Sequence, residues 1–166
     1  PRFDYKCSCI INYNIYANKF AYSNVGYKYL GLDFTPIRKE FSGKSIKIHP
    51  KIKNVFVSTG GSDALNITEK IINICCVQMP KFNFHILLGN MNCNSDELIN
   101  KYSKYSNIVF HHNGELISDI MTNCDLAITA CGSTVYELMS LGIPVITFIL
   151  ADNQIYNAEA LYSVNK

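Results

Sequence analysis

The sequence predicts an α/β protein built on a doubly wound parallel sheet. From residue 54 to residue 164, short apolar segments rich in β-branched residues alternate with segments of about ten residues that carry apolar side chains at helical spacing. Such alternation implies crossover connections, which join parallel strands. The expected strands are apolar along almost their whole length, as is typical of strands that helices cover on both faces. Glycine-rich turns follow two of them.

Each element follows from its own composition. The expected strands are the β-branched or aromatic runs at residues 54–61, 82–89, 107–112, 125–130 and 144–149. The expected helices occupy residues 66–79, 95–105, 115–124, 133–142 and 153–164. In the first of these helices, Ile67, Ile71, Ile74 and Cys75 recur at helical spacing. Ser95 is expected to cap the second helix.

The beginning of the chain does not follow this alternation. Residues 7–15 predict a strand rich in Ile and Tyr, and a loop with Asn and Gly follows. Residues 34–41 predict a short helix, with Thr35 as N-cap and a proline at the first helical position. We therefore expect residues 1–45 to be the tail of a preceding domain with a connecting helix. Residues 46–166 would form the α/β domain, in a fragment of a longer chain.

Charge and composition exclude several classes of protein. The net charge is +2 and basic and acidic residues are interspersed, without the basic stripe of a nucleic-acid-binding protein. No apolar stretch approaches the roughly 20 residues of a membrane span, and the first residues lack a signal-peptide pattern. The seven cysteines form no CxxC pair. This pattern favours reduced thiols in a cytoplasmic protein and argues against zinc, and we expect no metal and no cofactor.

Two glycine-rich turns, STGGSD and ACGST, carry the candidate chemistry. Ligands of doubly wound sheets bind beyond the carboxyl ends of the strands, and Gly60, Gly61 and Gly132 permit close backbone approach. A helix is expected directly after the second turn. Its free N–H groups and dipole favour a phosphate, with the hydroxyl of Ser133 or Thr134 as a further donor. The alternative is an ordinary connection, since neither turn matches a dinucleotide-binding or P-loop motif.

Several polar residues near these turns are candidates for sugar contacts. Glu137 lies one helical turn after Ser133, where a carboxylate can accept two hydrogen bonds from the vicinal diol of a ribose. The alternative is a solvated helix glutamate. Asn153 and Gln154 follow the last strand and carry amides that suit sugar or phosphate oxygens, and Asp63 is expected to stabilise its turn or contact a sugar.

The histidines give weaker signals. His85 lies in the middle of a strand and is expected to be packed. His111 and His112 close a strand at the expected ligand edge. No second residue supports either of them as a general base.

Three segments together resemble a known family. They are VSTGGSDALNITEKI, NIVFHHNGELISDIMTNCDLAITACGSTVYELMSLGIPVI and ADNQ. In this order they resemble the C-terminal half of the UDP-diacetamido-sugar hydrolases of pseudaminic acid biosynthesis and the related spore-coat polysaccharide proteins. INYNIYA and YLGLDFTPIRKEF resemble the family's exit from its N-terminal domain. The resemblance covers nearly the whole chain. A broader similarity to two-domain GT-B glycosyltransferases implies the C-terminal domain of a GT-B fold, with a Rossmann-like sheet.

The resemblance implies a UDP-sugar ligand and a position for each of its parts. The implied contacts are the diphosphate and sugar near Gly60, Gly61 and Ser62, the uracil along Asn113 to Ile117 mostly through backbone groups, the diphosphate at Gly132, Ser133 and Thr134, the ribose at Glu137, and the sugar or phosphate near Asn153 and Gln154. The family's catalytic histidine lies in an N-terminal GxGH loop that this sequence lacks. No catalytic residue is therefore assigned, and hydrolysis by this chain alone is not expected.

Three hypotheses about function follow. The leading one is the UDP-binding half of a hydrolase that releases UDP from a UDP-diacetamido-trideoxy sugar in surface polysaccharide biosynthesis. A GT-B glycosyltransferase that uses a UDP-sugar donor is the second, and a non-enzymatic α/β binding module is the third. A homo-oligomer of the fragment, paired through surface that a missing domain would cover, is left open.

Overall fold

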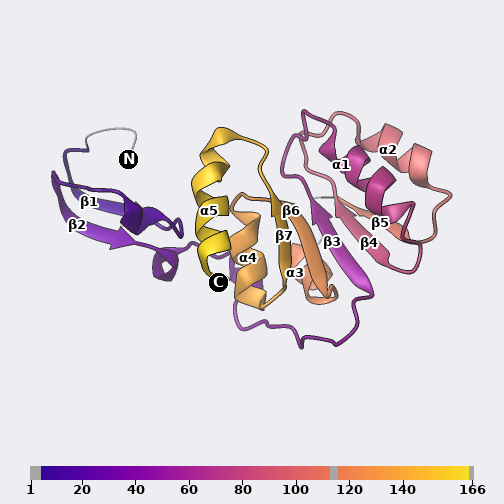
Figure 1. Cartoon of the computed structure of the whole chain (residues 1–166), viewed down its shortest axis with the longest axis horizontal. Helices are drawn as coiled ribbons and strands as arrows, with labels where there is room; N and C mark the ends of the chain where they lie inside the picture. Colours follow the sequence, from indigo (N-terminus) through magenta and orange to yellow (C-terminus); the bar gives the residue numbers. More distant parts are fainter. Residues whose placement is uncertain (1–4, 113–115, 165–166) are drawn as a thin grey trace. The chain divides into compact units, whose positions relative to one another are not determined.

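The computed structural model describes residues 5–112 and 116–164. The chain divides into two compact units, which we describe separately (Figure 1). The smaller unit combines Pro1–Ile37 with Ile149–Lys166, and the larger unit is Arg38–Phe148. The expected boundary after residue 45 concerns the organisation of a longer protein and stays a prediction.

The larger unit is built on a five-stranded parallel sheet, as the sequence predicted. The strand order is β5-β4-β3-β6-β7. The strands are β3 (Asn54–Ser58), β4 (Asn83–Leu87), β5 (Ile108–His111), β6 (Leu126–Ala130) and β7 (Val145–Phe148). Each lies within its predicted range and is shorter than predicted, because residues at the ends of the ranges, such as Gly60, Gly89 and Asp125, lie outside the strands.

The connections of the sheet run in two directions, so helices lie on both of its faces (Figure 1). From β3 the chain passes outward to β4 and β5, and it then crosses back to β6 and continues to β7. Right-handed crossovers place the helices of these two directions on opposite faces. The helices are α1 (Ile67–Ile71), α2 (Ser95–Tyr102), α3 (Ile117–Thr122) and α4 (Thr134–Leu141). A π-helical turn, Ile72–Cys76, continues α1.

Alternating strand side chains fill the core on each face. Val55 and Val57 pack with Ile72, Phe84 and other apolar residues from α1, α2 and the neighbouring strands. Phe56, between the two valines, is also fully buried. Burial on both faces explains why these strands read as continuous apolar runs in the sequence.

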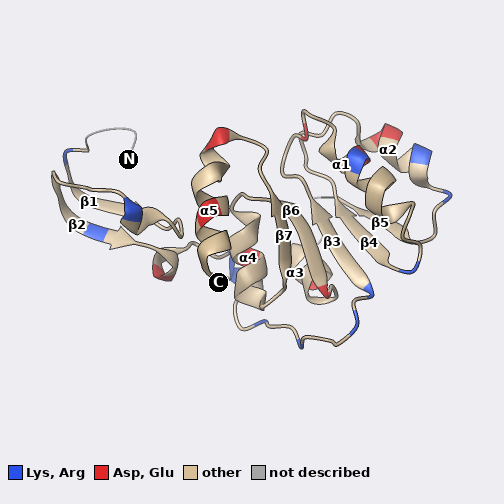
Figure 2. Ribbon diagram, in the orientation of Figure 1, with Lys and Arg blue, Asp and Glu red and all other residues tan. Residues whose placement is uncertain are grey.

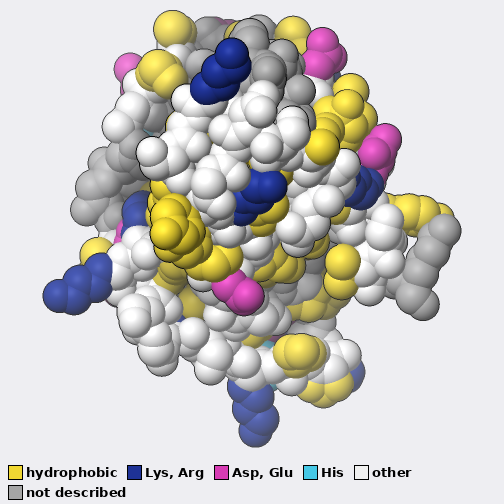
Figure 3. Space-filling view, turned by 90° about the vertical axis from the view of Figure 1, so that its left-hand side faces the viewer, with side chains coloured by type: hydrophobic (Ala, Val, Ile, Leu, Met, Phe, Trp, Pro, Cys, Tyr) yellow, Lys and Arg dark blue, Asp and Glu magenta, His cyan; other side chains and the backbone are white. Residues whose placement is uncertain are grey.

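The smaller unit contains a two-stranded parallel sheet and a C-terminal helix. Its strands are β1 (Cys7–Asn12) and β2 (Val25–Leu30), and its helix is α5 (Ile155–Val164). Ile11 and Tyr27 leave 64% and 70% of their surface exposed. Figure 3 faces this side of the molecule and shows hydrophobic side chains at the surface.

Two predictions for the first 45 residues were wrong. Residues 25–30, expected as loop, form β2, since pairing with β1 compensates for a sequence without clear alternation. The helix expected over 34–41 does not form. Thr35 is extended, with ψ of 124°, between two separate 3₁₀ turns. Thr35 has the extended geometry of an N-cap, but Arg38 is also extended, with ψ of 144°, so no helix follows for Thr35 to cap.

The predicted N-cap of α2 was wrong, and the structure also bears on the expected absence of a basic stripe and of a membrane span. The N-cap of α2 is Asn94 rather than Ser95, whose hydroxyl donates to the Asn92 carbonyl. Lys, Arg, Asp and Glu are spread over many elements rather than gathered in a stripe (Figure 2). Within the described residues, no helix combines the length and the apolar character needed to cross a membrane.

Candidate functional site

The two glycine-rich turns lie at one edge of the parallel sheet. β3 and β6 are neighbours, and Ser58 pairs with Thr129 near their carboxyl ends. The turns that follow these strands therefore emerge side by side. The chain leaves β3 toward one side of the sheet and β6 toward the other. This reversal of strand order is the topological switch point, where doubly wound sheets bind their ligands.

Hydrogen bonds among its own residues and the start of α1 stabilise the first glycine-rich turn. Gly60 has a φ of +93°, which is accessible to glycine at little cost. The buried hydroxyls of Thr59 and Thr68 lie 2.8 Å apart. The Asp63 carboxylate accepts hydrogen bonds from the N–H groups of Ile67 and Thr68 at 2.8 and 3.0 Å. Asp63 thus stabilises the turn and the start of α1, while Ser62 is exposed.

A third loop, which the sequence analysis did not single out, supports this turn. Gly89 follows β4, and a Cβ atom there would lie 2.5 Å from the Gly60 carbonyl oxygen and closer still to that of Gly61. The Met91 N–H donates to the Gly61 carbonyl at 3.0 Å. The only sequence signal was a glycine as the last residue of a predicted strand, which does not show where the loop packs.

The second turn leads directly into α4 and leaves backbone donors unused. The Gly132 N–H donates to the Ala130 carbonyl at 2.8 Å, and Ser133 stands at the N-cap position, although its side chain makes no capping bond. No described residue accepts a hydrogen bond from the N–H of Ser133 or Thr134. Free N–H groups at the positive end of a helix favour the binding of an anion.

Glu137 lies in the first turn of α4, but it is not a solvated glutamate, which was the alternative interpretation. Its side chain is 15% exposed and pairs with Arg38. The Arg38 Nε and Nη2 atoms lie 2.6 and 3.1 Å from the two carboxylate oxygens. This hydrogen-bonded pair raises the pKa of Arg38, against the opposing effect of burial. The sequence analysis missed Arg38 because it lies 99 positions before Glu137.

The segment expected to contact uracil lies partly outside the described residues. Asn113 is among the residues that the structure does not describe. Ile117 begins α3 and is buried. The N–H of the next residue, Ser118, donates to a Glu40 carboxylate oxygen at 3.1 Å.

Two histidines meet on neighbouring strands near the same edge. The Nδ1 atom of His85 lies 3.0 Å from the Nε2 atom of His111, with the ring planes 17° apart. One nitrogen must donate and the other accept, so at least one ring is neutral. Burial, with a smaller effect of His111, lowers the pKa of His85. His85 is therefore a packed strand residue, as expected.

Comparison with known proteins assigns the chain to a family. The glycosyltransferase family 28 C-terminal domain matches residues 54–166. The chain belongs to this family. A solved structure of the glycotransferase of kitacinnamycin shares its fold, with a TM-score of 0.58 at 17% identity over 84% of this chain and 35% of that one. The expected Rossmann-like α/β fold, shared with a GT-B glycosyltransferase, is confirmed.

Two curated relatives of this family 28 domain are much longer than the chain. An uncharacterized protein of Methanocaldococcus jannaschii is 34% identical over 135 residues, which cover 78% of this chain and 27% of that protein. A Helicobacter pylori protein is 28% identical over 157 residues, which cover 93% of this chain and 28% of that protein. It is described as pseudaminic acid cytidylyltransferase and UDP-2,4-diacetamido-2,4,6-trideoxy-beta-L-altropyranose hydrolase. The chain thus spans little more than a quarter of either relative.

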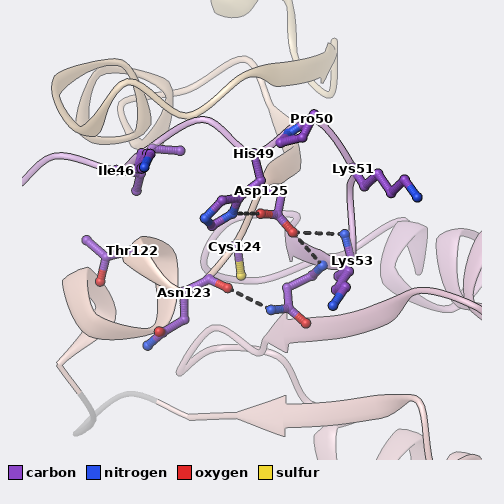
Figure 4. Close-up of a pocket in the computed structure, with 11 residues that line it drawn as sticks. Ile46, His49, Pro50, Lys51, Lys53, Thr122, Asn123, Cys124 and Asp125 are labelled. Carbon is purple, nitrogen blue, oxygen red and sulfur yellow. Dashed lines mark hydrogen bonds and ion pairs between the residues drawn. The ribbon is translucent and has the colours of Figure 1, made fainter.

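The family 28 domain also has a cavity at the opposite, amino edge of its sheet (Figure 4). It measures about 460 Å³. His49 Nδ1 lies 2.7 Å from one Asp125 oxygen, and the N–H groups of Lys53 and Asn54 donate to the other. Burial raises the pKa of Asp125, but these hydrogen bonds together lower it below its usual range. We interpret these contacts, which join the loop before β3 to the residue before β6, as a tie between the loop and the sheet.

Asn153 and Gln154 belong to the smaller unit and are described within it. They lie in a 3₁₀ turn before α5, and the Gln154 side-chain oxygen accepts a hydrogen bond from the Leu150 N–H at 2.9 Å. Asn153 is exposed and lines a cavity of about 810 Å³ with aromatic residues such as Tyr16 and Tyr156. Their expected sugar contacts stay predictions.

Proposed function

We propose that this family 28 domain binds UDP at the carboxyl edge of its five-stranded sheet. The observation that carries the proposal is the unused N–H pair of Ser133 and Thr134 at the start of α4, beside the Gly60 turn at the topological switch point. A diphosphate placed there would accept backbone hydrogen bonds and meet the positive end of the helix dipole.

The family resemblance assigns candidate partners to the remaining parts of UDP. The diphosphate and sugar would lie against Gly132 and the turn of Gly60, Gly61 and Ser62, with Asp63 holding that turn. The ribose diol would approach Glu137 in the first turn of α4. The uracil would lie along Asn113 to Ile117, against the start of α3.

We further propose that the longer protein hydrolyses a UDP-diacetamido-trideoxy sugar. The name of the Helicobacter pylori relative supports this activity. Water would attack the anomeric carbon and UDP would leave, with its developing charge stabilised by the α4 dipole and the hydroxyls of the second turn. The base would come from a preceding domain, because this sequence has no Gly-rich loop with a histidine.

Transfer of the sugar to an acceptor is the second candidate, and the family match favours it. The same UDP contacts would serve both reactions. UDP release by the longer protein that requires an added acceptor would indicate transfer, whereas release in water alone would indicate hydrolysis.

A calorimetric titration of the chain with UDP, with CMP and ADP as controls, tests the binding proposal. Glu137→Gln should weaken UDP binding about tenfold or more, since hydrogen bonds to a charged acceptor are lost. Glu97→Gln is the matched control, because Glu97 lies in the first turn of α2 and its loss removes the same charge. The proposal would be contradicted if the chain bound UDP, CMP and ADP equally, or if Glu137→Gln and Glu97→Gln bound UDP equally. Absence of nucleotide binding would favour a non-enzymatic module.

A further inference from the structure

Arg38 lies at the centre of a charged network in the larger unit. Besides its two-point contact with Glu137, its Nη1 atom lies 2.8 Å from a Glu40 carboxylate oxygen. Its guanidinium carbon lies 5.0 Å from the centre of the Phe41 ring, in a cation–π arrangement. Phe41 is only 2% exposed, so the arginine packs against a buried ring. Each donor face of the guanidinium therefore has a defined partner.

The same segment also reaches the start of α3. The second Glu40 oxygen accepts the Ser118 N–H at 3.1 Å. The Lys44 ammonium lies 2.7 Å from the Ser118 hydroxyl and also contacts the Asp119 carboxylate. The segment Arg38–Lys44 thus contacts the first turns of both α3 and α4. Both helices follow strands whose carboxyl ends lie at the proposed nucleotide edge.

The chemistry of the contact favours orientation of the glutamate rather than charge compensation alone. A guanidinium is planar and meets a carboxylate at two points, which fixes the plane of the carboxylate. An ionised carboxylate offers about four acceptor sites on its two oxygens. Arg38 uses two of them. The other two remain available to a vicinal diol.

We infer that Arg38 is a positioning residue of the nucleotide site, which holds Glu137 ready for the ribose and, through Glu40, aligns the first turn of α3. The inference rests on the proposed UDP binding and deepens it. It makes the RKEF segment, which the sequence analysis placed in a connecting helix, part of the machinery that selects a ribonucleotide. Selection between ribose and deoxyribose is the property that a merely structural ion pair would not affect.

The test compares the affinities of the chain for UDP and 2′-deoxy-UDP by calorimetry. The unaltered chain should prefer UDP by about tenfold, the effect of one hydrogen bond to a charged acceptor. Arg38→Gln should reduce this preference to less than about threefold, because the carboxylate plane is no longer fixed. Arg38→Lys should reduce the preference to the same extent, since an ammonium cannot make the two-point contact. Lys101→Gln, which breaks the 2.6 Å pair with Glu69 on α2, should leave the preference unchanged.

Two further variants keep the test decisive. Arg38→Gln combined with Glu137→Gln should show the same preference as Glu137→Gln alone, because Arg38 acts through the glutamate. Glu40→Gln keeps the Arg38–Glu137 contact, so the preference for UDP over 2′-deoxy-UDP should be retained. Because it loosens the first turn of α3, it should weaken the binding of both nucleotides to the same extent. It also provides a readout if Arg38→Gln unfolds the chain.

The outcomes separate this inference from the proposed function. A preference retained in both Arg38 variants would overturn it. Tighter UDP binding by Arg38→Gln would also overturn it, since Arg38 would then compete with the ribose for Glu137. If the unaltered chain binds no UDP, or does not distinguish it from 2′-deoxy-UDP, the proposed ribose contact itself is wrong, and the inference fails with it.

Discussion

Gly89 is the residue on which the shape of the first glycine turn depends most directly. Its Cβ position is blocked by the backbone carbonyls of Gly60 and Gly61. We predict that Gly89→Ala lowers the free energy of unfolding by about 3 kcal/mol, at the upper end of overpacking costs. Gly43→Ala is the control. Gly43 has a φ of +72° with no atom within 4 Å of its Cβ position, so only the backbone cost of about 1 kcal/mol applies. Urea denaturation measures both, and equal losses would contradict the prediction.

His85 predicts a dependence of stability on pH. Its pKa is lowered in the folded chain, so below about pH 6.5 the unfolded chain binds more protons than the folded one. The free energy of unfolding should therefore decrease as the pH falls from 7.5 to 5.5. His85→Gln should flatten this slope, whereas replacement of the exposed His112 by Gln should retain it. A slope unchanged by His85→Gln would show that another group causes it.

Site residues could be predicted where they lie close together in the sequence, and could not be predicted where they are far apart. Gly132, Ser133 and Glu137 lie within six positions of one another, so helical geometry alone placed them together. Arg38 and Gly89 reach the site through tertiary packing, which no local pattern encodes. The role of Asp63 in stabilising its turn was foreseen as one of two alternatives, and the structure shows the bonds that achieve it.

At the scale of elements, α1 depends on a cap outside the helix. The helix has five residues before its π-helical turn, and the Asp63 carboxylate satisfies two of its N–H groups. We predict that Asp63→Ala lowers the free energy of unfolding by about 1–2 kcal/mol, the usual effect of losing an N-terminal cap. Asp63→Asn should cost less, since it keeps one acceptor and tolerates the φ of 46°. Equal losses in thermal unfolding would contradict this order.

The elements that were predicted correctly share a cause. The strands of the five-stranded sheet are apolar along most of their length; β3 at its centre is buried on both faces, although the edge strands β5 and β7 expose Val109 and Ile146. β2 lacks this signal, because most of its residues are exposed. The false helix at 34–41 came from taking the proline after Thr35 as a helix start, whereas Arg38 is extended and interrupts any helix that begins there.

At the scale of the whole molecule, the smaller unit exposes an incomplete sheet. Among the described residues, β1 and β2 pair only with each other, and Ile11 and Tyr27 lie largely in solvent. Parallel sheets ordinarily have both faces covered and more than two strands. We predict that the chain self-associates as its concentration rises, through this surface. Sedimentation should show less association for Ile11→Ser with Tyr27→Ser.

The control for self-association uses exposed apolar residues of the larger unit. Leu65 and Ile74 are 60% and 61% exposed, close to the values for Ile11 and Tyr27. Leu65→Ser with Ile74→Ser should leave the association unchanged. If this control pair reduces association as strongly as the first pair, the surface of β1 and β2 is not the interface.

The central claim is that UDP binds at the carboxyl edge of the five-stranded sheet. Amide chemical-shift mapping by NMR, with UDP titrated into the ¹⁵N-labelled chain, tests it most directly. We predict the largest changes at Gly61, Ser133 and Thr134, and none at Asn54 and Asp125, which lie at the amino edge. Changes concentrated at the amino edge, or no changes at any amide with UDP in excess, would contradict the account.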